Sequence, residues 1–189
     1  IVRSKILHDL ASSMQDRNFD TEGYCERLQE LAASRVCSLE LSQDFINNLF
    51  LLARFHDLGK MGISNHLFFK PGPLNEEGWL QMRQHCEIDR TASSVPDLEP
   101  IADYILKHHE NWDGSGYPLS LSGEDIPLLW RILAIADAYD AMTSDRPYRK
   151  AMTREEAITE LRPFAGTQFD PHLVEIFIGL LQVHNKEPL

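Results

Sequence analysis

The chain has 189 residues, of which 43% are hydrophobic and 25% charged, as expected of a globular protein with one sizeable core. Its formal net charge of -11 argues against binding a nucleic-acid polymer, and an anionic ligand would need local cations or metal ions. No apolar run is long enough to span a membrane and no signal peptide is visible, so we expect no membrane contact.

The three cysteines, Cys25, Cys37 and Cys86, form no CxxC pair, and an odd number provides no disulfide framework. We interpret them as small buried hydrophobic residues of a cytoplasmic protein. The sequence begins at Ile1, without a methionine and already in a helical pattern. We therefore expect residues 1–189 to form one domain cut from a longer protein, with an upstream sensor or signalling domain.

Apolar periodicity and capping residues predict helices throughout the chain. The predicted helices are 1–17, a segment beginning at Asp20-Thr21, 42–57 with Ser42 as its cap, 76–86, 97–109, a segment beginning at Asp125 and Pro127, one from Thr153 to Pro163, and one beginning at Asp170-Pro171. Glycine, proline and serine predict loops at 63–75 and 110–126. Because no run alternates in polarity and no repeat is present, the predicted fold is an all-α bundle of helices.

Potential metal ligands lie at the ends of these predicted helices or within them. They are His56, Asp57, His85, His108, His109 and Asp137. Imidazole nitrogen and carboxylate oxygen together suit Fe, Mn, Zn, Co or Ni. Asp137 interrupts an otherwise apolar helix, and a lone buried carboxylate is costly, so it needs a metal, Arg131 or a backbone amide as its partner.

The consecutive motifs resemble those of an HD-GYP domain, a branch of the HD metal-dependent phosphohydrolase superfamily. The matching stretches are 56–60 (HDLGK), 70–72 (KPG), His85, 108–110 (HHE), 113–118 (DGSGYP), 131–137, 144–149 (SDRPYR), Gly166 and 169–171 (FDP). The resemblance covers nearly the whole chain. It implies a bacterial phosphodiesterase that hydrolyses cyclic di-GMP to pGpG or GMP with two or three metals, often Fe or Mn.

The resemblance also implies roles for individual residues. Asp57 would bridge two metals per chain, one completed by His85, His108 and His109, the other held by His56 and Asp137. Two metals can activate water and bind phosphate oxygens at neutral pH. Asp57 and Lys60 are therefore the predicted catalytic residues. The predicted substrate-binding residues are Lys60, Tyr117, Arg146 and Arg149. Because imidazole must be neutral to bind a metal, we expect occupancy to fall below about pH 6.5.

The sequence departs from the family pattern before the His56-Asp57 pair. Asp20 stands where the family has a carboxylate and remains a candidate ligand for a third metal. Tyr24 stands where the family has a metal-binding histidine, and a neutral phenol is a poor ligand. Packing of Tyr24 in the core is the simpler interpretation of its position. We therefore expect the metal held by His56 and Asp137 to be weakened.

Two other functions remain open. A catalytically weak domain could bind cyclic di-GMP or a partner protein and regulate its neighbours, and Tyr24 favours this alternative. A general nucleotidase acting on mononucleotides is the other, although the Gly116-Tyr117-Pro118 loop and the 146–149 stretch count against it. Lys60, Arg146 and Arg149 could also be solvated surface charges. The sequence does not determine whether the domain forms a homodimer.

Overall fold

The computed structural model describes residues 2–16, 42–68, 70, 72–86, 95–145 and 150–183. The α-helices are α1 (Val2–Asp16), α3 (Gln43–Phe55), α4 (Asn65–Phe68), α5 (Glu76–Arg83), α7 (Glu99–Leu106), α8 (Leu128–Thr143), α9 (Arg154–Leu161) and α10 (Pro171–Val183). Short 3₁₀ segments are η1 (Leu58–Gly62), η3 (Gly123–Asp125) and η4 (Arg162–Phe164). Within these ranges there is no β-strand, which confirms the predicted all-α class, and no helix is long and apolar enough to cross a membrane.

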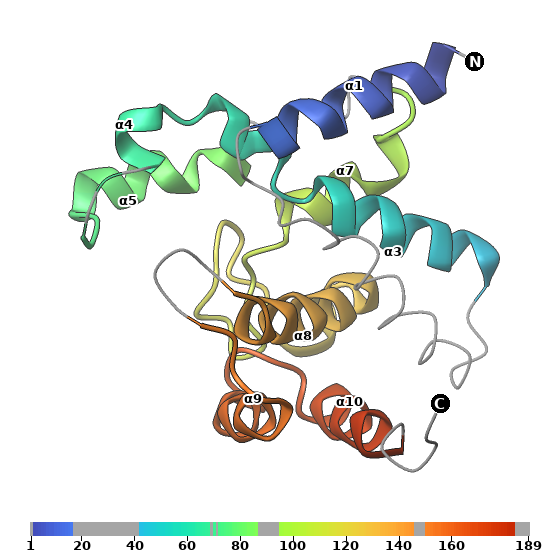
Figure 1. Ribbon diagram of the computed structural model, residues 1–189, viewed down its shortest axis with the longest axis vertical. Helices are drawn as coiled ribbons and strands as arrows, with labels where there is room; N and C mark the ends of the chain where they lie inside the picture. Colours follow the sequence, from blue (N-terminus) through green and yellow to red (C-terminus); the bar gives the residue numbers. More distant parts are fainter. Residues whose placement is uncertain are drawn as a thin grey trace.

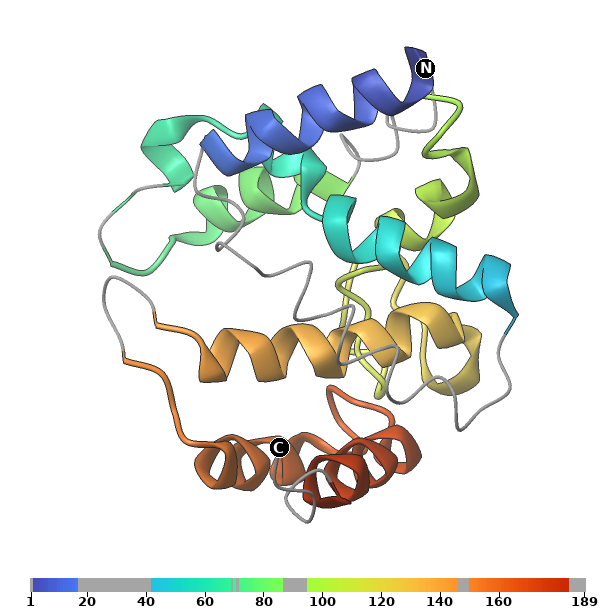
Figure 2. The same cartoon turned by 45° about the vertical axis from the view of Figure 1, so that its right-hand side comes forward.

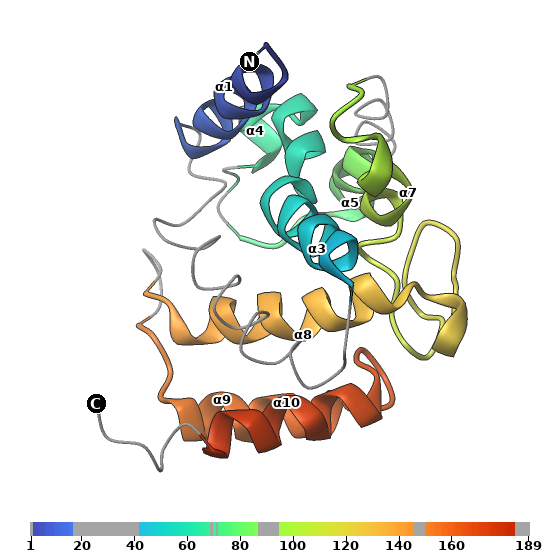
Figure 3. The same cartoon turned by 90° about the vertical axis from the view of Figure 1, so that its right-hand side faces the viewer.

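Helix α8 separates two groups of helices (Figure 1). On one side lie α1, α3, α4, α5 and α7, and on the other side α9 and α10 run alongside it (Figures 2 and 3). Contacts between α3 and α8, and between α8 and both α9 and α10, bring these groups together. One cluster of buried apolar side chains extends from α1 to α10, so α8 is the central element of a continuous core.

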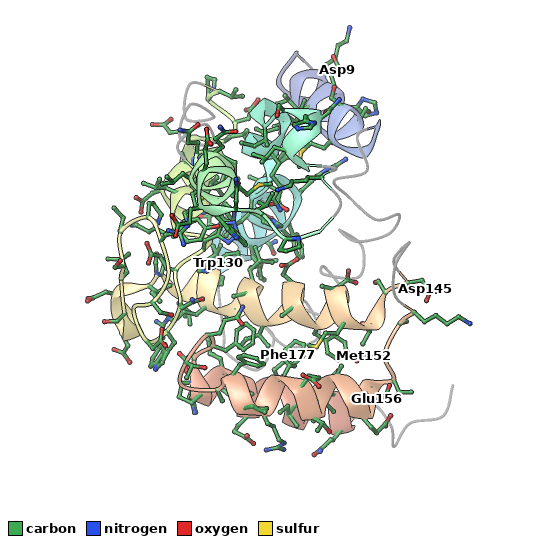
Figure 4. All side chains as sticks on the ribbon, turned by 90° about the vertical axis from the view of Figure 1, so that its left-hand side faces the viewer. Asp9, Trp130, Asp145, Met152, Glu156 and Phe177 are labelled. Carbon is green, nitrogen blue, oxygen red and sulfur yellow. The ribbon has the colours of Figure 1, made fainter. Side chains whose placement is uncertain are left out.

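The two faces of α8 pack against different neighbours. Phe177 of α10 lies between α8 and the α9–α10 pair (Figure 4), and its ring makes an edge contact with Tyr139 at 5.3 Å. Trp130 lies on the other side of α8, towards the larger group of helices (Figure 4). The first face packs the bundle, whereas the second borders the histidines described below.

Several predicted caps are present. Ser42 Oγ accepts a hydrogen bond from the Phe45 amide at 3.2 Å, and Thr153 and Glu156 form the predicted capping box of α9. Asp170 accepts hydrogen bonds from the amides of residues 172 and 173 at the start of α10, and also pairs with Arg131 of α8 at 2.8 Å. This buried carboxylate thus fixes the start of α10 against α8.

Two predicted helix ends were too late, one predicted helix is interrupted by a turn, and one predicted loop contains a helix. Helices α3 and α7 end at residues 55 and 106 rather than at 57 and 109, and the chain leaves each of them at a turn that contains a predicted ligand, His56 or His108. Helix α5 ends at residue 83, and after a turn at residue 84 residues 85 and 86 are helical again. The predicted loop 63–75 contains the single-turn helix α4, which is too short to show a periodic pattern.

Candidate metal centre

A pocket of about 410 Å³ lies beside α8, along the stretch from Trp130 to Ala138. The predicted site residues that line this pocket are His56, Asp57, Lys60, His108, His109, Tyr117 and Asp137. They come from the turn after α3, from η1, from the segment after α7 and from α8 itself. The fold therefore gathers residues that lie more than 80 positions apart in the chain.

Three histidine rings converge behind this pocket. His85 Nε2 lies 3.1 Å from His108 Nε2 and 3.0 Å from His109 Nε2. Cys86 joins them, with its Sγ 3.7 Å from His85 Nε2, and one ligand atom from each of the four residues lies within 4.8 Å of the others. His85, Cys86 and His108 are almost fully buried. This cluster has the composition of a transition-metal site.

The hydrogen bonds of two rings fix which nitrogen carries the proton. Nδ1 of His85 lies 2.5 Å from the carbonyl oxygen of Met82, and Nδ1 of His108 lies 2.5 Å from that of Ile105. A carbonyl oxygen only accepts, so both Nδ1 atoms are donors and both neutral rings present an unprotonated Nε2. Two lone pairs then face each other across 3.1 Å, an arrangement that a shared cation would stabilise.

The same logic applies to His56 and Asp57 in the turn after α3. His56 Nδ1 approaches the carbonyl oxygens of Leu52 and Ala53, so its Nε2 faces Asp57 Oδ2 at 3.5 Å. The other oxygen, Asp57 Oδ1, lies 3.6 Å from His108 Nε2. Asp57 is thus placed between the His56 ring and the three-histidine cluster, as a bridging ligand would be.

The electrostatic environment keeps the carboxylate charged and the imidazoles neutral. Burial would raise the pKa of Asp57, but its charged and polar neighbours, Lys60 first among them, outweigh burial and hold that pKa well below its usual range. Burial is the main cause that lowers the pKa of His85 to about 4, and burial also lowers the pKa of His108 and of His109. At neutral pH all four side chains are therefore in the protonation states that metal binding requires.

Asp137 and Lys60 complete the charged lining of the pocket. Asp137 projects from α8 into the same pocket as His56, and Arg131, one of its alternative partners, pairs with Asp170 instead. Lys60 Nζ lies 2.7 Å from Asp57 Oδ2, so Lys60 lies within the site rather than being a solvated surface charge.

The loop that contains Tyr117 closes one side of the pocket. The Tyr117 ring stacks on the His109 ring, with 4.8 Å between the two ring centroids. The guanidinium carbon of Arg83 lies 4.7 Å from the centroid of the Tyr117 ring. Buried Glu110 accepts hydrogen bonds from the amides of Leu119 and Leu121 at 2.6 and 2.9 Å. Glu110 therefore acts as a brace that fixes the loop against the histidine segment.

Gly116 allows the loop to approach this segment closely. A Cβ at this position would lie 2.3 Å from the Asn111 backbone nitrogen and 2.5 Å from the His109 carbonyl oxygen. Both neighbours are backbone atoms that cannot rotate away. Only glycine therefore fits at this point of the loop.

We expect Gly116→Ala to destabilise the protein by at least about 1–3 kcal/mol, the usual cost of overpacking. Urea unfolding would measure the change. Gly179→Ala is the matched control, because its Cβ would meet nothing within 4 Å and α10 should gain about 0.5–1 kcal/mol from alanine. Equal effects of the two substitutions would contradict the steric role of Gly116.

Some predicted residues lie outside the described ranges. These are Asp20, Tyr24, Arg146 and Arg149, together with Cys25 and Cys37. The roles that the sequence predicts for them therefore stay predictions: Asp20 as a metal ligand, Tyr24 in place of the family's histidine, Arg146 and Arg149 as substrate contacts, and Cys25 and Cys37 as buried thiols.

The structure also reveals residues that the sequence analysis did not single out. Trp79, Asn111, Trp130 and Gln168 line the pocket, and the Trp130 ring makes an edge contact with His108 at 5.7 Å. Tryptophan and amide side chains are common in cores and on surfaces, so nothing in their local sequence marked them. Cys86 could have been noticed, because it directly follows the predicted ligand His85.

Comparison with known proteins identifies the family to which the chain belongs. Residues 6–173 match the model of the HD domain family. A cyclic di-GMP phosphodiesterase of Thermotoga maritima is 36% identical over 179 residues, which cover 93% of this chain and 49% of the relative. The 3'3'-cGAMP-specific phosphodiesterase 2 of Vibrio cholerae is also 36% identical, over 92% of this chain and 34% of its own length.

A solved structure supports the fold. The cyclic GMP-AMP phosphodiesterase V-cGAP3 of Vibrio cholerae superposes with a TM-score of 0.70 at 22% identity, covering 95% of this chain and 48% of that protein. The chain thus spans about half or less of the length of these relatives. Matching motifs, fold and family model lead to one conclusion: the chain belongs to the HD domain family, as its resemblance to HD-GYP domains predicted.

Proposed function

We propose that this domain is a metal-dependent phosphodiesterase that hydrolyses cyclic di-GMP to pGpG or GMP in bacterial signalling. The observation that carries the proposal is the convergence of unprotonated His85 and His108 nitrogens beside Asp57, at the edge of a pocket of about 410 Å³. Pockets for small ligands have volumes of roughly 300–1,000 Å³. The names of the relatives, which include cyclic di-GMP and cyclic GMP-AMP phosphodiesterases, support the class of substrate.

The donor atoms fit divalent transition metals, two per chain, with Fe or Mn first and Zn, Ni or Co as alternatives. His85, His108, His109 and Asp57 would hold one metal, and His56, Asp57 and Asp137 the other, with Asp20 as a further candidate ligand. When bound, these metals would supply Lewis-acid polarisation of the phosphodiester and acidification of a water molecule.

The chain's own residues would bind and orient the substrate. Among the residues that the structure describes, Lys60 is the cation that lines the pocket and could pair with a phosphate oxygen, and its Nζ lies 2.7 Å from Asp57 Oδ2. Tyr117 contacts both Arg83 and His109, and these two contacts orient its ring at the pocket wall. Burial keeps the phenol of Tyr117 protonated, because it raises its pKa. Tyr117 would therefore act as a hydrogen-bond donor rather than as a base.

Product analysis after incubation of metal-loaded protein with cyclic di-GMP would test the proposal. Release of pGpG or GMP is expected, and parallel reactions with 3'3'-cGAMP and with mononucleotides would define the substrate class. If protein with bound metal takes up cyclic di-GMP without hydrolysing it, the regulatory alternative that Tyr24 favours replaces this proposal. An upstream signalling domain and a cytoplasmic location stay predictions, and a homodimer stays an open possibility.

We expect Lys60→Ala to weaken cyclic di-GMP binding by about tenfold to a hundredfold, because a hydrogen bond to a charged group contributes about 1.5–3 kcal/mol. Metal content should stay the same. Isothermal titration calorimetry and elemental analysis would measure the two quantities. Arg162→Ala is the control, since Arg162 pairs with Glu175 in an exposed ion pair outside the pocket. Unchanged affinity in Lys60→Ala would exclude a contact between Lys60 and the substrate.

We expect Tyr24→His to raise metal content and the rate of hydrolysis. The family places an imidazole at this position, and a phenol with a pKa near 10 is a poor donor to a divalent ion. Wild type and variant should be loaded with the same metal under reducing conditions and compared by elemental analysis and product release. If the wild type already holds two metals and the variant is no faster, Tyr24 is a working part of the site.

A further inference from the structure

The buried thiol of Cys86 lies beside the histidine cluster, and none of the assignments above gives it a function. We propose that Cys86 is a direct ligand of the metal held by His85, His108 and His109, as its thiolate. The inference rests on the metal dependence of the proposed function. It adds a sulfur donor to a site that the HD-GYP resemblance describes with nitrogen and oxygen donors alone.

The distances between donor atoms fit one shared ion. Tetrahedral Zn²⁺ with Zn–N distances of about 2.0–2.1 Å and a Zn–S distance of about 2.3 Å places its donors about 3.3–3.6 Å from one another. Cys86 Sγ lies 3.7 Å from His85 Nε2, and the Nε2 atom of His85 lies 3.0–3.1 Å from those of its two neighbours. One donor atom of each of the four residues lies within 4.8 Å of all the others.

The orientation of the His85 ring indicates that Cys86 does more than fill space in the core. Its Nδ1 donates to the Met82 carbonyl, so its Nε2 offers a lone pair towards both the sulfur and the other rings. In the metal-free protein the thiol can donate to this nitrogen, and the lone pairs of His85 and His108 still oppose each other. A cation at the centre of the group would satisfy all of these donor atoms at once, and the thiol would release its proton to solvent on binding.

A sulfur ligand would change which metal the site prefers. Thiolates favour Zn²⁺, Fe²⁺ and Co²⁺ over harder ions such as Mn²⁺ and Mg²⁺. The carboxylate of Asp57, 3.6 Å from His108 Nε2, would then be a fifth donor at this position. We therefore infer that this position selects a softer ion than the position formed by His56, Asp57 and Asp137.

X-ray absorption spectroscopy on the wild-type protein loaded with Zn²⁺ would test the proposal without any substitution. One sulfur neighbour at about 2.3 Å is expected in addition to nitrogen and oxygen. With Co²⁺, a thiolate-to-cobalt charge-transfer band in the near ultraviolet should accompany the visible ligand-field bands. Neither measurement depends on catalytic activity.

Substitutions would then assign the sulfur. Cys86→Ala should abolish the charge-transfer band and weaken Co²⁺ binding by at least about tenfold. Tenfold is the smallest loss of metal affinity that is typical when a residue that only hydrogen-bonds to a ligand is removed. Cys25→Ala and Cys37→Ala are matched controls that should retain the band. If Cys86 only fills space, Cys86→Ala would lower the free energy of unfolding of the metal-free protein and leave Co²⁺ affinity unchanged.

The possible results separate this inference from the proposed function. Metal bound by nitrogen and oxygen alone would overturn the role of Cys86 and leave the phosphodiesterase proposal in place. Failure to bind Zn²⁺, Co²⁺, Fe²⁺ or Mn²⁺ would overturn both. Circular dichroism would show whether Cys86→Ala folds, and if it does not, the absorption spectrum of the wild type decides alone.

Discussion

His108→Ala is expected to remove the metal of the histidine cluster and to reduce phosphodiesterase activity to background. His108 is almost fully buried and lies close to both halves of the site, with its Nε2 3.1 Å from His85 Nε2 and 3.6 Å from Asp57 Oδ1. Loss of a residue that merely supports a ligand costs 10–100-fold in metal affinity, so loss of His108 itself should cost more than about a hundredfold.

The measurement is metal content after dialysis against a fixed concentration of free metal, followed by product release. His66→Ala is the matched control, because His66 is exposed on α4 and lies outside the pocket. The effect on the fold can be followed separately through the unfolding of both variants in the presence of a chelator. Full metal occupancy in His108→Ala would show that the cluster is not the metal centre.

The sequence predicted most of the helices and named titratable residues that the fold brings close together. Periodicity identified α3 and α8, and capping residues marked the starts of α9 and α10, because these signals are local. The helix ends were predicted less well. Residues 56 and 108 lie in turns just beyond α3 and α7, and residue 85 follows a turn at residue 84, at points where tertiary contacts rather than helix propensity determine the path of the chain.

The roles of Glu110 and Cys86 could not be predicted from their local sequence. Glu110 appeared only as part of a motif, and its function as a brace depends on the amides of residues 119 and 121, which a folded loop brings to it. The prediction that Cys86 is buried is confirmed. Burial alone did not indicate its neighbours, because His108 and His109 lie more than 20 residues further along the chain and meet it only through packing.

The environment of the histidines also revises the pH expected for metal loss. Protonation of an unperturbed imidazole would compete with the metal below about pH 6.5. In the folded protein the pKa of His85 is lowered to about 4, so direct competition between protons and metal at this residue begins near pH 4. Between pH 6.5 and pH 4 the buried His85 imidazole therefore stays unprotonated and available to a metal. In this range a lower pH instead shifts the equilibrium from the folded towards the unfolded protein.

We therefore expect the metal-free protein to lose stability steeply between pH 6.5 and pH 4. In this window the unfolded chain binds a proton at residue 85 that the folded protein excludes, so the free energy of unfolding must fall as the pH falls. A pKa difference of one corresponds to about 1.4 kcal/mol, which gives a loss of about 3 kcal/mol from His85 alone. The lowered pKa values of His108 and His109 act in the same direction.

Urea unfolding at a series of pH values, with a chelator present, would measure this loss. The stabilisation that comes from the lowered pKa of Asp57 is lost only below its ordinary value of 3.8, so the histidines dominate the window above that pH. His85→Gln should reduce the loss by about 3 kcal/mol, because glutamine does not titrate. The exposed control His66→Gln should keep the loss of the wild type. A free energy of unfolding that stays constant from pH 7 to pH 4 would mean that the histidine cluster is open to water, and the tautomers inferred for His85 and His108 would no longer hold.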